Sequence, residues 1–382
     1  MIKAKDITVC AHDKCAGCMA CVDLCPKQAI TIVDSHIAYN AVIDENKCIH
    51  CNLCEKICQN NKKVNLLQPI SWNQGWIKDE EVRGRSSSGG AAKALSLQFI
   101  KDGGVVISCC FQNGVFHFEC AKTAIDLEKF VGSKYVKSNP SGVYKNIIRL
   151  IKDNQKVLFI GLPCQVSAVK SVVGNSDYLY TVDLICHGTP SPELLKDYLY
   201  SHSIELDKIG SISFRNKSKF GLRQNERYIS YPGSCDAYSL AFLCGIDYTE
   251  NCYNCCYAGT KRISDITIGD SWGSDLPIDE QKKGISLILC QTEKGKNLLN
   301  KSNMELFPVS AEKAISANHQ LREPTPKTKK HDKFFAVYTQ GGFDKATLSC
   351  MPDKYIKQRI KAFLLKAKIL RGGVNYNITY IK

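Results

Sequence analysis

No stretch of the sequence approaches the run of about eighteen apolar residues that a membrane-spanning helix needs. The first residues, Met1–Asp6, lack the apolar core of a secretory signal. No arrangement of Ser, His and Asp suggests a side-chain nucleophile of the hydrolase type. These absences predict a cytoplasmic, non-transmembrane protein whose chemistry does not depend on such a nucleophile.

Apolar residues make up 44% of the 382-residue chain and charged residues 23%, which is ordinary for a protein with hydrophobic cores. Length alone suggests two or three domains. The 21 cysteines are abundant, yet a chain this long does not need disulfides as staples. Metal binding is therefore the first use to consider for these cysteines.

Eight cysteines between residues 15 and 58 repeat one spacing twice. Each run reads C-x-x-C-x-x-C-x-x-x-C, with three thiolates on a tight loop and the fourth one helical turn later. In two-cluster bacterial ferredoxins the fourth cysteine ligates the other cluster. The spacing predicts two [4Fe–4S] clusters, held by Cys15, Cys18, Cys21 and Cys58 and by Cys48, Cys51, Cys54 and Cys25.

Disulfides and zinc are the alternatives for these cysteines. Zinc ribbons pair C-x-x-C motifs at wider separation and do not need the third cysteine of each run. Pro26 follows the first run as in the ferredoxin pattern, whereas Gln59 replaces proline after the second, which changes a turn and no ligand. Because exposed clusters suffer from oxygen, we expect a reducing compartment, in an anaerobe.

Residues 1–65 are expected to form a ferredoxin module, followed by a connector over 66–82. A loop of Ser and Gly at residues 86–90 then precedes a helix expected over 91–100. Backbone N–H groups at such a helix start can hold a phosphate, and two arginines lie upstream. A flexible linker or a plain N-cap is the alternative, since the loop matches neither a Walker nor a dinucleotide fingerprint.

Two strand–helix units follow, with strands expected at 157–160 and 178–185. Cys164 and Cys186 come directly after these strands, at the carboxyl ends where open α/β sheets place ligands. The second helix should start with Ser191 as N-cap and Pro192 at its first position. A buried structural thiol is the alternative for either cysteine.

Cys252 and Cys255 have the C-x-x-C spacing of metal ligands. With Cys164 and Cys186 they make four loop thiolates that could hold one more [4Fe–4S] cluster. Cys256 competes with Cys255, while Cys235 and Cys244 are spare candidates. The cysteines in apolar strands are expected to be packing residues: Cys109, Cys110, Cys120 and Cys290.

The net charge of +14 is concentrated at the C-terminus, where residues 327–382 hold thirteen Lys and Arg against three Asp. Residues 322–330 are expected to form a linker. Residues 353–371 should form a basic amphipathic helix with one apolar face, made of Ile356, Ile360, Phe363, Leu364 and Ala367. A nucleic-acid binder would interleave aromatic residues with these charges, so a solvated basic helix is the simpler interpretation.

The ordered succession of these segments resembles the family of coenzyme F-420 hydrogenase/dehydrogenase beta subunits, with an N-terminal two-cluster ferredoxin domain. The resemblance spans residues 15 to about 290. The segments that carry it, besides the ferredoxin runs, are residues 85–90, 133–136, 161–165, 186–192, 214–217 and 252–273.

The resemblance implies a flavin, usually FAD, in an α/β core beside a [4Fe–4S] cluster, and hydride exchange with coenzyme F-420 or another two-electron carrier. The residues expected at the flavin are Arg85, Ser86, Ser87, Ser88, Gly89, Gly90, Ser133, Lys134 and Tyr135. The third cluster would have Cys164, Cys186, Cys252 and Cys255 as its ligands.

The expected fold is α+β: a bacterial-type two-cluster ferredoxin domain (1–65), an α/β flavin-binding core in two parts (66–150 and 151–322), and a basic linker with a C-terminal helix (323–382). The expected function is that of an iron–sulfur flavoprotein oxidoreductase. It would exchange hydride with a small molecule and single electrons with a redox partner protein or other carrier. The alternative is a non-catalytic electron-relay subunit of a larger redox complex.

Overall fold

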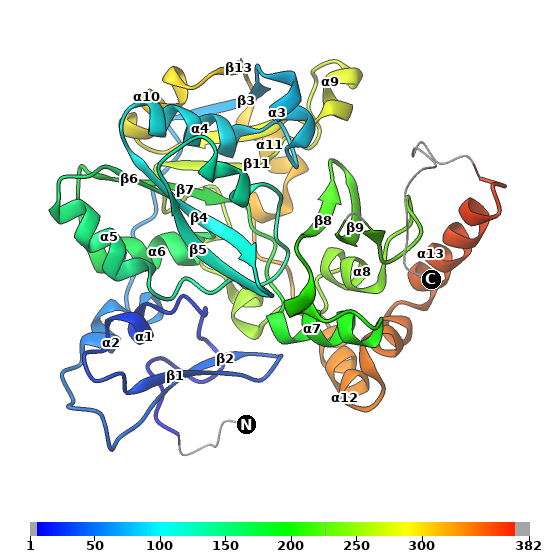
Figure 1. Cartoon of the computed structure of the whole chain (residues 1–382), viewed down its shortest axis with the longest axis horizontal. Helices are drawn as coiled ribbons and strands as arrows, with labels where there is room; N and C mark the ends of the chain where they lie inside the picture. The colour runs from blue at the N-terminus through cyan, green and yellow to red at the C-terminus, as the bar shows by residue number, and fades with distance from the viewer. Residues whose placement is uncertain (1–5, 226, 371–382) are drawn as a thin grey trace.

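A computed structural model of the chain describes residues 6–225 and 227–370 (Figure 1). An eight-stranded mixed sheet lies at its centre. In spatial order its strands are β13 (Met304–Pro308), β3 (Ser71–Ile77), β12 (Ser286–Cys290), β11 (Ile266–Asp270), β7 (Leu179–Leu184), β6 (Val157–Gly161), β4 (Val105–Gln112) and β5 (Val115–Ala121).

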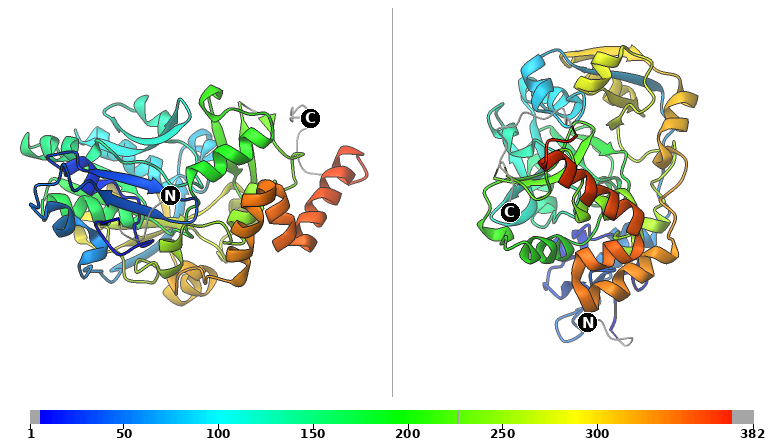
Figure 2. Two further views of the ribbon diagram at one scale, coloured as in Figure 1. Left: turned by 90° about the horizontal axis from the view of Figure 1, so that it is seen from below. Right: turned by 90° about the vertical axis from the view of Figure 1, so that its right-hand side faces the viewer.

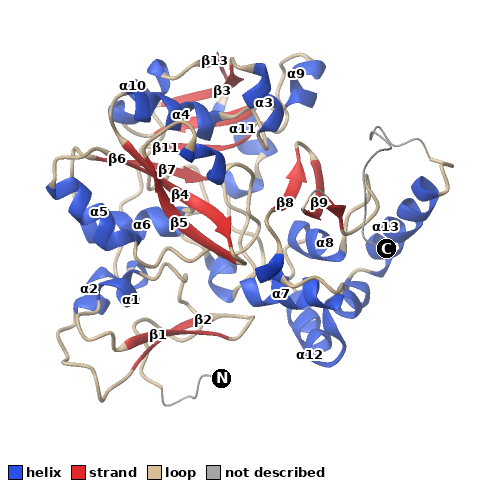
Figure 3. Ribbon diagram, viewed as in Figure 1, coloured by secondary structure: helices blue, strands red, loops and turns tan. Residues whose placement is uncertain are grey.

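The four neighbouring strands β11, β7, β6 and β4 run parallel, and antiparallel strands extend the sheet on both sides. Helices cover both faces, as a parallel sheet requires (Figure 3). On one face Leu158 and Ile160 of β6 pack with α4 (Ala91–Lys101) and α10 (Glu293–Lys301). On the other face Val157 and Phe159 pack with α5 (Val143–Lys152) and α6 (Pro163–Val173).

The N-terminal module consists of the hairpin β1 (Ile30–Asp34) and β2 (Tyr39–Ile43) and the short helices α1 (Ala20–Leu24) and α2 (Leu53–Ile57). It lies directly against α5 and α6, below them in Figure 1. Ala20 and Ile57 join the hydrophobic cluster of those helices. The module is therefore packed on the core and not merely tethered to it.

A second hydrophobic cluster lies beside the sheet. It is built from the strands β8 (Ile212–Asn216) and β9 (Lys219–Gln224) and the helices α7 (Pro192–Ser201), α8 (Ala237–Leu243) and α12 (Lys329–Cys350). The remaining α-helices and strands are β10 (Arg227–Tyr228), α3 (Glu80–Arg85), α9 (Ile278–Lys283), α11 (Ala311–Ala317) and α13 (Pro352–Lys366). Figure 2 shows α13 at the edge of the molecule, beyond α12.

The predicted mixed α/β core is present, and several predicted elements are confirmed. Ser191 caps α7 by accepting a hydrogen bond from the backbone of Glu193, with Pro192 at the first helical position. Two expectations are wrong. The expected connector over 66–82 contains strand β3, which lies between β12 and β13, and the expected linker over 322–330 already contains the start of α12.

Candidate iron–sulfur and flavin sites

The outer cysteine set lies in the N-terminal module. Cys48, Cys51 and Cys54 line one cavity together with Cys25, which follows the end of α1. Cys51 is exposed, and so is the neighbouring Ile49. A cluster held by these four thiolates would therefore be close to the surface of the protein.

The inner cysteine set lines a second cavity in the same module. Cys15, Cys18 and Cys21 come from the first run, and Cys58 joins them from the end of α2. Cys15 and Cys21 are buried, and the side chain of Cys18 packs against the cluster of α5 and α6. This set faces the core.

The two runs repeat the same backbone turn. Gly17 and His50, each two residues after the first cysteine of its run, both have positive φ angles, 67° and 50°. In this conformation each backbone N–H donates to the preceding thiol, Gly17 to Cys15 and His50 to Cys48, both at 3.4 Å. Such N–H···S bonds tune the potential of iron–sulfur clusters.

No disulfide joins any of the 21 cysteines. Among the described residues, no three of the predicted cluster cysteines have their sulfurs within 4.8 Å of one another, as three ligands of one ion would. Four irons lie between the ligands of a cluster, so a cluster needs its sulfurs farther apart.

The third cysteine set lies between the sheet and the N-terminal module, and its four side chains are partly buried. Cys164 is in the first turn of α6, Cys186 follows β7, and Cys252 and Cys255 lie in and after the 3-10 helix Glu250–Asn254. Burial, followed by the nearby Cys252 and Cys255, raises the pKa of Cys186 to about 12. Burial likewise raises the pKa of Cys164, and the other three thiols of the set contribute.

Two of the three spare cysteines lie away from this set. Cys235 and Cys244 pack in the cluster of α7, α8 and α12, where Cys235 N donates to Gln358 and Cys244 accepts from Lys354 of α13. The third, Cys256, is exposed and adjoins Cys255 in the chain.

Gln59, which replaces the expected proline, joins the inner set to the third set. Its side-chain Nε2 donates to the backbone carbonyl of Cys164 at 2.7 Å, and its Oε1 accepts from the hydroxyl of Tyr257. Gln59 is 4% exposed and directly follows Cys58. Gln59 thus links the backbone next to Cys58 of the inner set with the backbone of Cys164 in the third set. The spacing of the cysteines did not reveal this contact.

Lys137 is a second contact between the same two sets. It is buried, and its Nζ donates to the carbonyl of Ala16 at 3.2 Å. Its charge acts to lower the pKa of both Cys164 and Cys186. A cation at this place stabilises the added negative charge of a reduced cluster.

The two segments expected at the flavin are adjacent. Ser133 N donates to Ser87 Oγ at 3.0 Å, and Tyr135 stacks on Phe242 with ring centroids 4.4 Å apart. Arg85 is not part of this contact, because it points to the surface and pairs with Glu128 at 3.2 Å. The other upstream arginine, Arg83, is buried and held by Glu280, so it is not available for a phosphate either.

The hydroxyl and ammonium groups of the two segments are satisfied inside the protein. Ser86 and Ser88 donate to the carbonyls of Val82 and Ile285. Lys134 donates to three backbone carbonyls, and burial lowers its pKa. These side chains stabilise the loop and leave little for a ligand.

Three backbone N–H groups of the loop form no hydrogen bond within the described part of the protein. Within residues 6–225 and 227–370, these N–H groups, of Ser88, Gly89 and Gly90, have no hydrogen-bond acceptor. These groups precede α4, and Gly90 has a φ of 85°. Adjacent free N–H groups at a helix N-terminus fit a phosphate.

Arg215 and Lys217 bring positive charge to this loop. Residues 214–217 carry part of the family resemblance, but their position beside the loop was not predicted. Arg215 donates to Ser87 O at 2.8 Å and Tyr135 Oη at 3.1 Å, and it forms a two-pronged ion pair with Asp270. Lys217 donates to Ser88 O at 3.1 Å. Burial, followed by the charges of Arg83 and Arg215, lowers the pKa of Lys217 to about 8.

Cys10 is a further thiol at the inner set. It lines the same cavity as the four predicted ligands. Cys10 lies outside both repeats, so their spacing gave no signal for it. Of the four expected packing cysteines, Cys110 and Cys290 are buried, while Cys109 and Cys120 are half-buried.

No helix in the described part of the chain is long and apolar enough to cross a membrane.

Comparison with known proteins gives two family matches. Residues 14–62 match a 4Fe–4S dicluster domain, which implies two [4Fe–4S] clusters and electron transfer. Residues 154–311 match the C terminus of the coenzyme F-420 hydrogenase/dehydrogenase beta subunit, whose family is one of oxidoreductases.

One curated relative belongs to the F(420)H(2) dehydrogenase of Methanosarcina mazei, in which it is one of the subunits. It is 24% identical over 305 residues, which cover 70% of this chain and 79% of the relative. A structure of the F-420-reducing [NiFe] hydrogenase complex from Methanosarcina barkeri matches with 18% identity and a TM-score of 0.48, covering 68% of this chain and 94% of that one. The chain thus combines an N-terminal 4Fe–4S dicluster domain with a segment of the family that forms the C terminus of coenzyme F-420 hydrogenase/dehydrogenase beta subunits.

Proposed function

We propose that this protein is an iron–sulfur flavoprotein oxidoreductase. It would transfer electrons between a two-electron carrier, coenzyme F-420 or another, and a one-electron partner. A bound flavin supplies the exchange between hydride and single electrons, and [4Fe–4S] clusters supply one-electron transfer. On this proposal residues 1–65 form the ferredoxin module, residues 66–322 the flavin-binding core, and the inner and outer cysteine sets hold one cluster each.

The observation that carries the proposal is the succession of three cysteine sets from core to surface. Gln59 bonds the backbone at Cys164 and follows Cys58 of the inner set. The inner and outer runs exchange their fourth cysteines, so each set contains a residue of the other run. The outer set is exposed at Cys51, where a partner protein can approach.

The flavin part of the proposal depends on the loop before α4. The N–H groups of Ser88, Gly89 and Gly90 would hold the phosphates, and Lys217 would supply a positive charge beside them. Tyr135, stacked on Phe242, gives an aromatic wall next to this loop. FAD is the flavin that the family resemblance favours.

An electron-relay subunit without its own substrate is the second candidate. The internal bonds of Ser86, Ser88 and Lys134 favour it, because these side chains need no ligand to be satisfied. Both candidates require a redox partner. The Methanosarcina mazei relative is named as one subunit within a larger dehydrogenase, which suggests a multi-subunit assembly of the same kind.

Anaerobic purification followed by iron, sulfide and flavin analysis separates these candidates. The proposal predicts about twelve irons per chain in three [4Fe–4S] clusters, and one flavin. About twelve irons without flavin would favour the relay subunit. About eight irons with full flavin would remove the third cluster from the proposal.

A further inference from the structure

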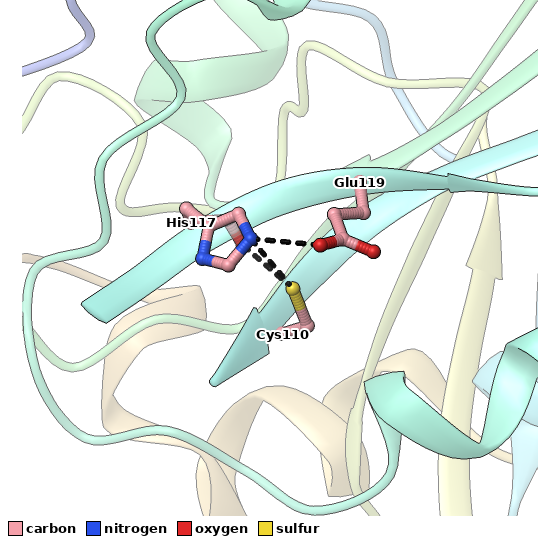
Figure 4. Close-up of side chains that lie close together, drawn as sticks. All are labelled: Cys110, His117 and Glu119. Carbon is pink, nitrogen blue, oxygen red and sulfur yellow. Dashed lines mark hydrogen bonds and ion pairs between the residues drawn. The ribbon is translucent and has the colours of Figure 1, made fainter. Parts of the chain in front are cut away.

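Three potential metal ligands meet on the hairpin of β4 and β5, away from the three cysteine sets. Cys110 and His117 are directly opposite each other in the strand register, and Glu119 lies two residues after His117 on the same face of β5. One ligand atom from each lies within 4.8 Å of the other two (Figure 4). Among the described residues, no other trio of His, Cys, Asp or Glu side chains meets this distance.

The distances suit a single ion. His117 Nε2 lies 3.5 Å from Cys110 Sγ and 2.9 Å from Glu119 Oε1. Zinc bonds to sulfur at about 2.3 Å and to nitrogen and oxygen at about 2.0–2.2 Å, so its ligands lie roughly 3–4 Å from one another. One ion could contact all three atoms after small side-chain rotations.

The orientation of His117 is compatible with metal binding. Nδ1 lies 3.4 Å from the carbonyl of Val115, and Nε2 faces the carboxylate of Glu119 at 2.9 Å. In the tautomer with its proton on Nδ1, the ring donates to the carbonyl, and the lone pair of Nε2 is free to bind a metal. An Nδ1–H bond to a backbone carbonyl is the usual support for a metal-bound histidine.

The same contacts argue against a nucleophilic thiol. In a Cys–His–Glu triad the two ring nitrogens serve different partners, the thiol and the carboxylate. Here Nε2 faces both Cys110 and Glu119. Burial, together with Glu119, raises the pKa of Cys110 to about 11, the opposite of the shift that activates a thiol.

We propose that Cys110, His117 and Glu119 form a binding site for a divalent transition metal, zinc by the character of its ligands. Glu119 would bind through Oε1 only, since Lys129 holds Oε2 at 2.6 Å. Cys110 is 2% exposed, whereas the side chains of His117 and Glu119 are 30% and 31% exposed, so a fourth ligand can come from solvent. Three protein ligands with an open position are typical of non-structural zinc sites.

Zinc titration of the anaerobic, cluster-loaded full chain tests this site. Zinc and iron are measured in the protein after gel filtration, and affinity is measured against a chromophoric chelator. We expect one tightly bound zinc per chain without loss of iron. His117→Gln, at a partly exposed position that should tolerate the change, and Cys110→Ser should each weaken binding by at least about 100-fold, since even outer-shell partners contribute 10–100-fold.

Two matched variants sharpen the result. Cys120→Ser removes another thiol from β5 and should leave zinc affinity unchanged, because Cys120 points to Asn146. Lys129→Met removes the competing cation at Glu119 and should strengthen binding. X-ray absorption at the zinc edge should show one sulfur ligand among nitrogen and oxygen ligands.

Unchanged zinc affinity in His117→Gln, or zinc uptake only with loss of iron, would overturn the site. So would a zinc edge spectrum without sulfur. A Cys110→Ser variant that fails to fold would leave His117→Gln and Lys129→Met to decide the question. None of these measurements depends on flavin or electron transfer, so they stand apart from the proposed function.

Discussion

Replacing Gln59 tests the contact between the inner cysteine set and the core. Gln59→Leu keeps approximate size and removes both side-chain hydrogen bonds. The hydroxyl of Tyr257 then loses its acceptor, whereas the carbonyl of Cys164 still accepts the backbone hydrogen bond of helix α6. A buried group left unsatisfied costs about 1–3 kcal/mol, and the lost bond to the carbonyl adds about 1 kcal/mol. We therefore expect a loss of about 2–4 kcal/mol in apparent stability.

The partner substitution has a smaller expected effect. Tyr257→Phe leaves Gln59 bound to Cys164 and strands only the Oε1 atom, at a cost of about 1–3 kcal/mol. In the double variant the two introduced apolar side chains would face each other, and no polar side-chain group of this contact would remain unpaired. The two costs should therefore not add, and the shortfall should be about 1 kcal/mol or more.

Anaerobic denaturant titrations, followed by the visible absorbance of the clusters, measure these differences. Gln98→Leu is the matched control, because Gln98 lies on the surface of α4 and bonds only Asp102. That change should stay within about 0.5 kcal/mol. A neutral Gln59→Leu variant, or costs that simply add in the double variant, would refute the role given to Gln59.

Four further outcomes are expected. Ser87→Asp places a carboxylate beside the loop before α4, where it would repel the flavin phosphates. Released-flavin analysis should show loss of flavin while the iron content stays unchanged. Unchanged flavin would mean that the loop is only a helix cap. Lys217 in the flavin-free protein should titrate near pH 8, so flavin binding should weaken as pH rises through about 8. Lys217→Arg should abolish this pH dependence, because arginine stays charged. The same pH dependence of binding in both proteins would exclude Lys217. By the same shift, the unfolded chain binds more protons between about pH 8 and 10.5, so this lysine makes stability rise with pH over that window. A chain ending at Met351 should keep its clusters, because the apolar residues Ile356, Ile360 and Phe363 of α13 are exposed. A chain ending at Lys327 should not fold, because α12 buries Phe334 and Phe343. Soluble, cluster-containing protein from the shorter chain would contradict this prediction.

The cysteine sets were accessible from sequence because ligand spacing is a local property. The first three thiols of each run lie on one loop, and the repeat made the pattern specific. The start of α7 was accessible for the same reason, since Ser191 and Pro192 act within one turn. Prediction of the third set required the order of strands β6 and β7. The apolar runs and the family resemblance together indicated that order.

Strand β3 was not predicted because contacts with residues far away in the chain stabilise it. Its polar residue Gln74 is buried, and it is satisfied by Asp275 and Ser271, which lie about 200 positions away in the chain. Gly75 is required because a Cβ there would meet the carbonyl of Glu305 at 2.0 Å. Neither partner can be recognised from residues 71–77 alone.

Helix α12 was missed because its start resembles a linker and its middle is kinked. Lysines open the helix, and Gly342 has a φ of 76° within it. Its buried residues contact α7 and α8, which come about a hundred residues earlier. The amphipathic helix predicted beyond it is α13, and the last residue of that prediction, Arg371, lies outside the described residues.

The central claim is that electrons pass from the core to the outer cysteine set through the third one. Cys164→Ser tests it most directly, because serine is a poor iron ligand of similar size in the first turn of α6. Stopped-flow mixing of the anaerobic variant with a hydride donor and a one-electron acceptor is the measurement. We expect about four irons to be lost, flavin reduction by the donor to persist, and transfer to the acceptor to fail. Full iron content with unchanged donor-to-acceptor turnover would show that Cys164 is a structural thiol and contradict the account.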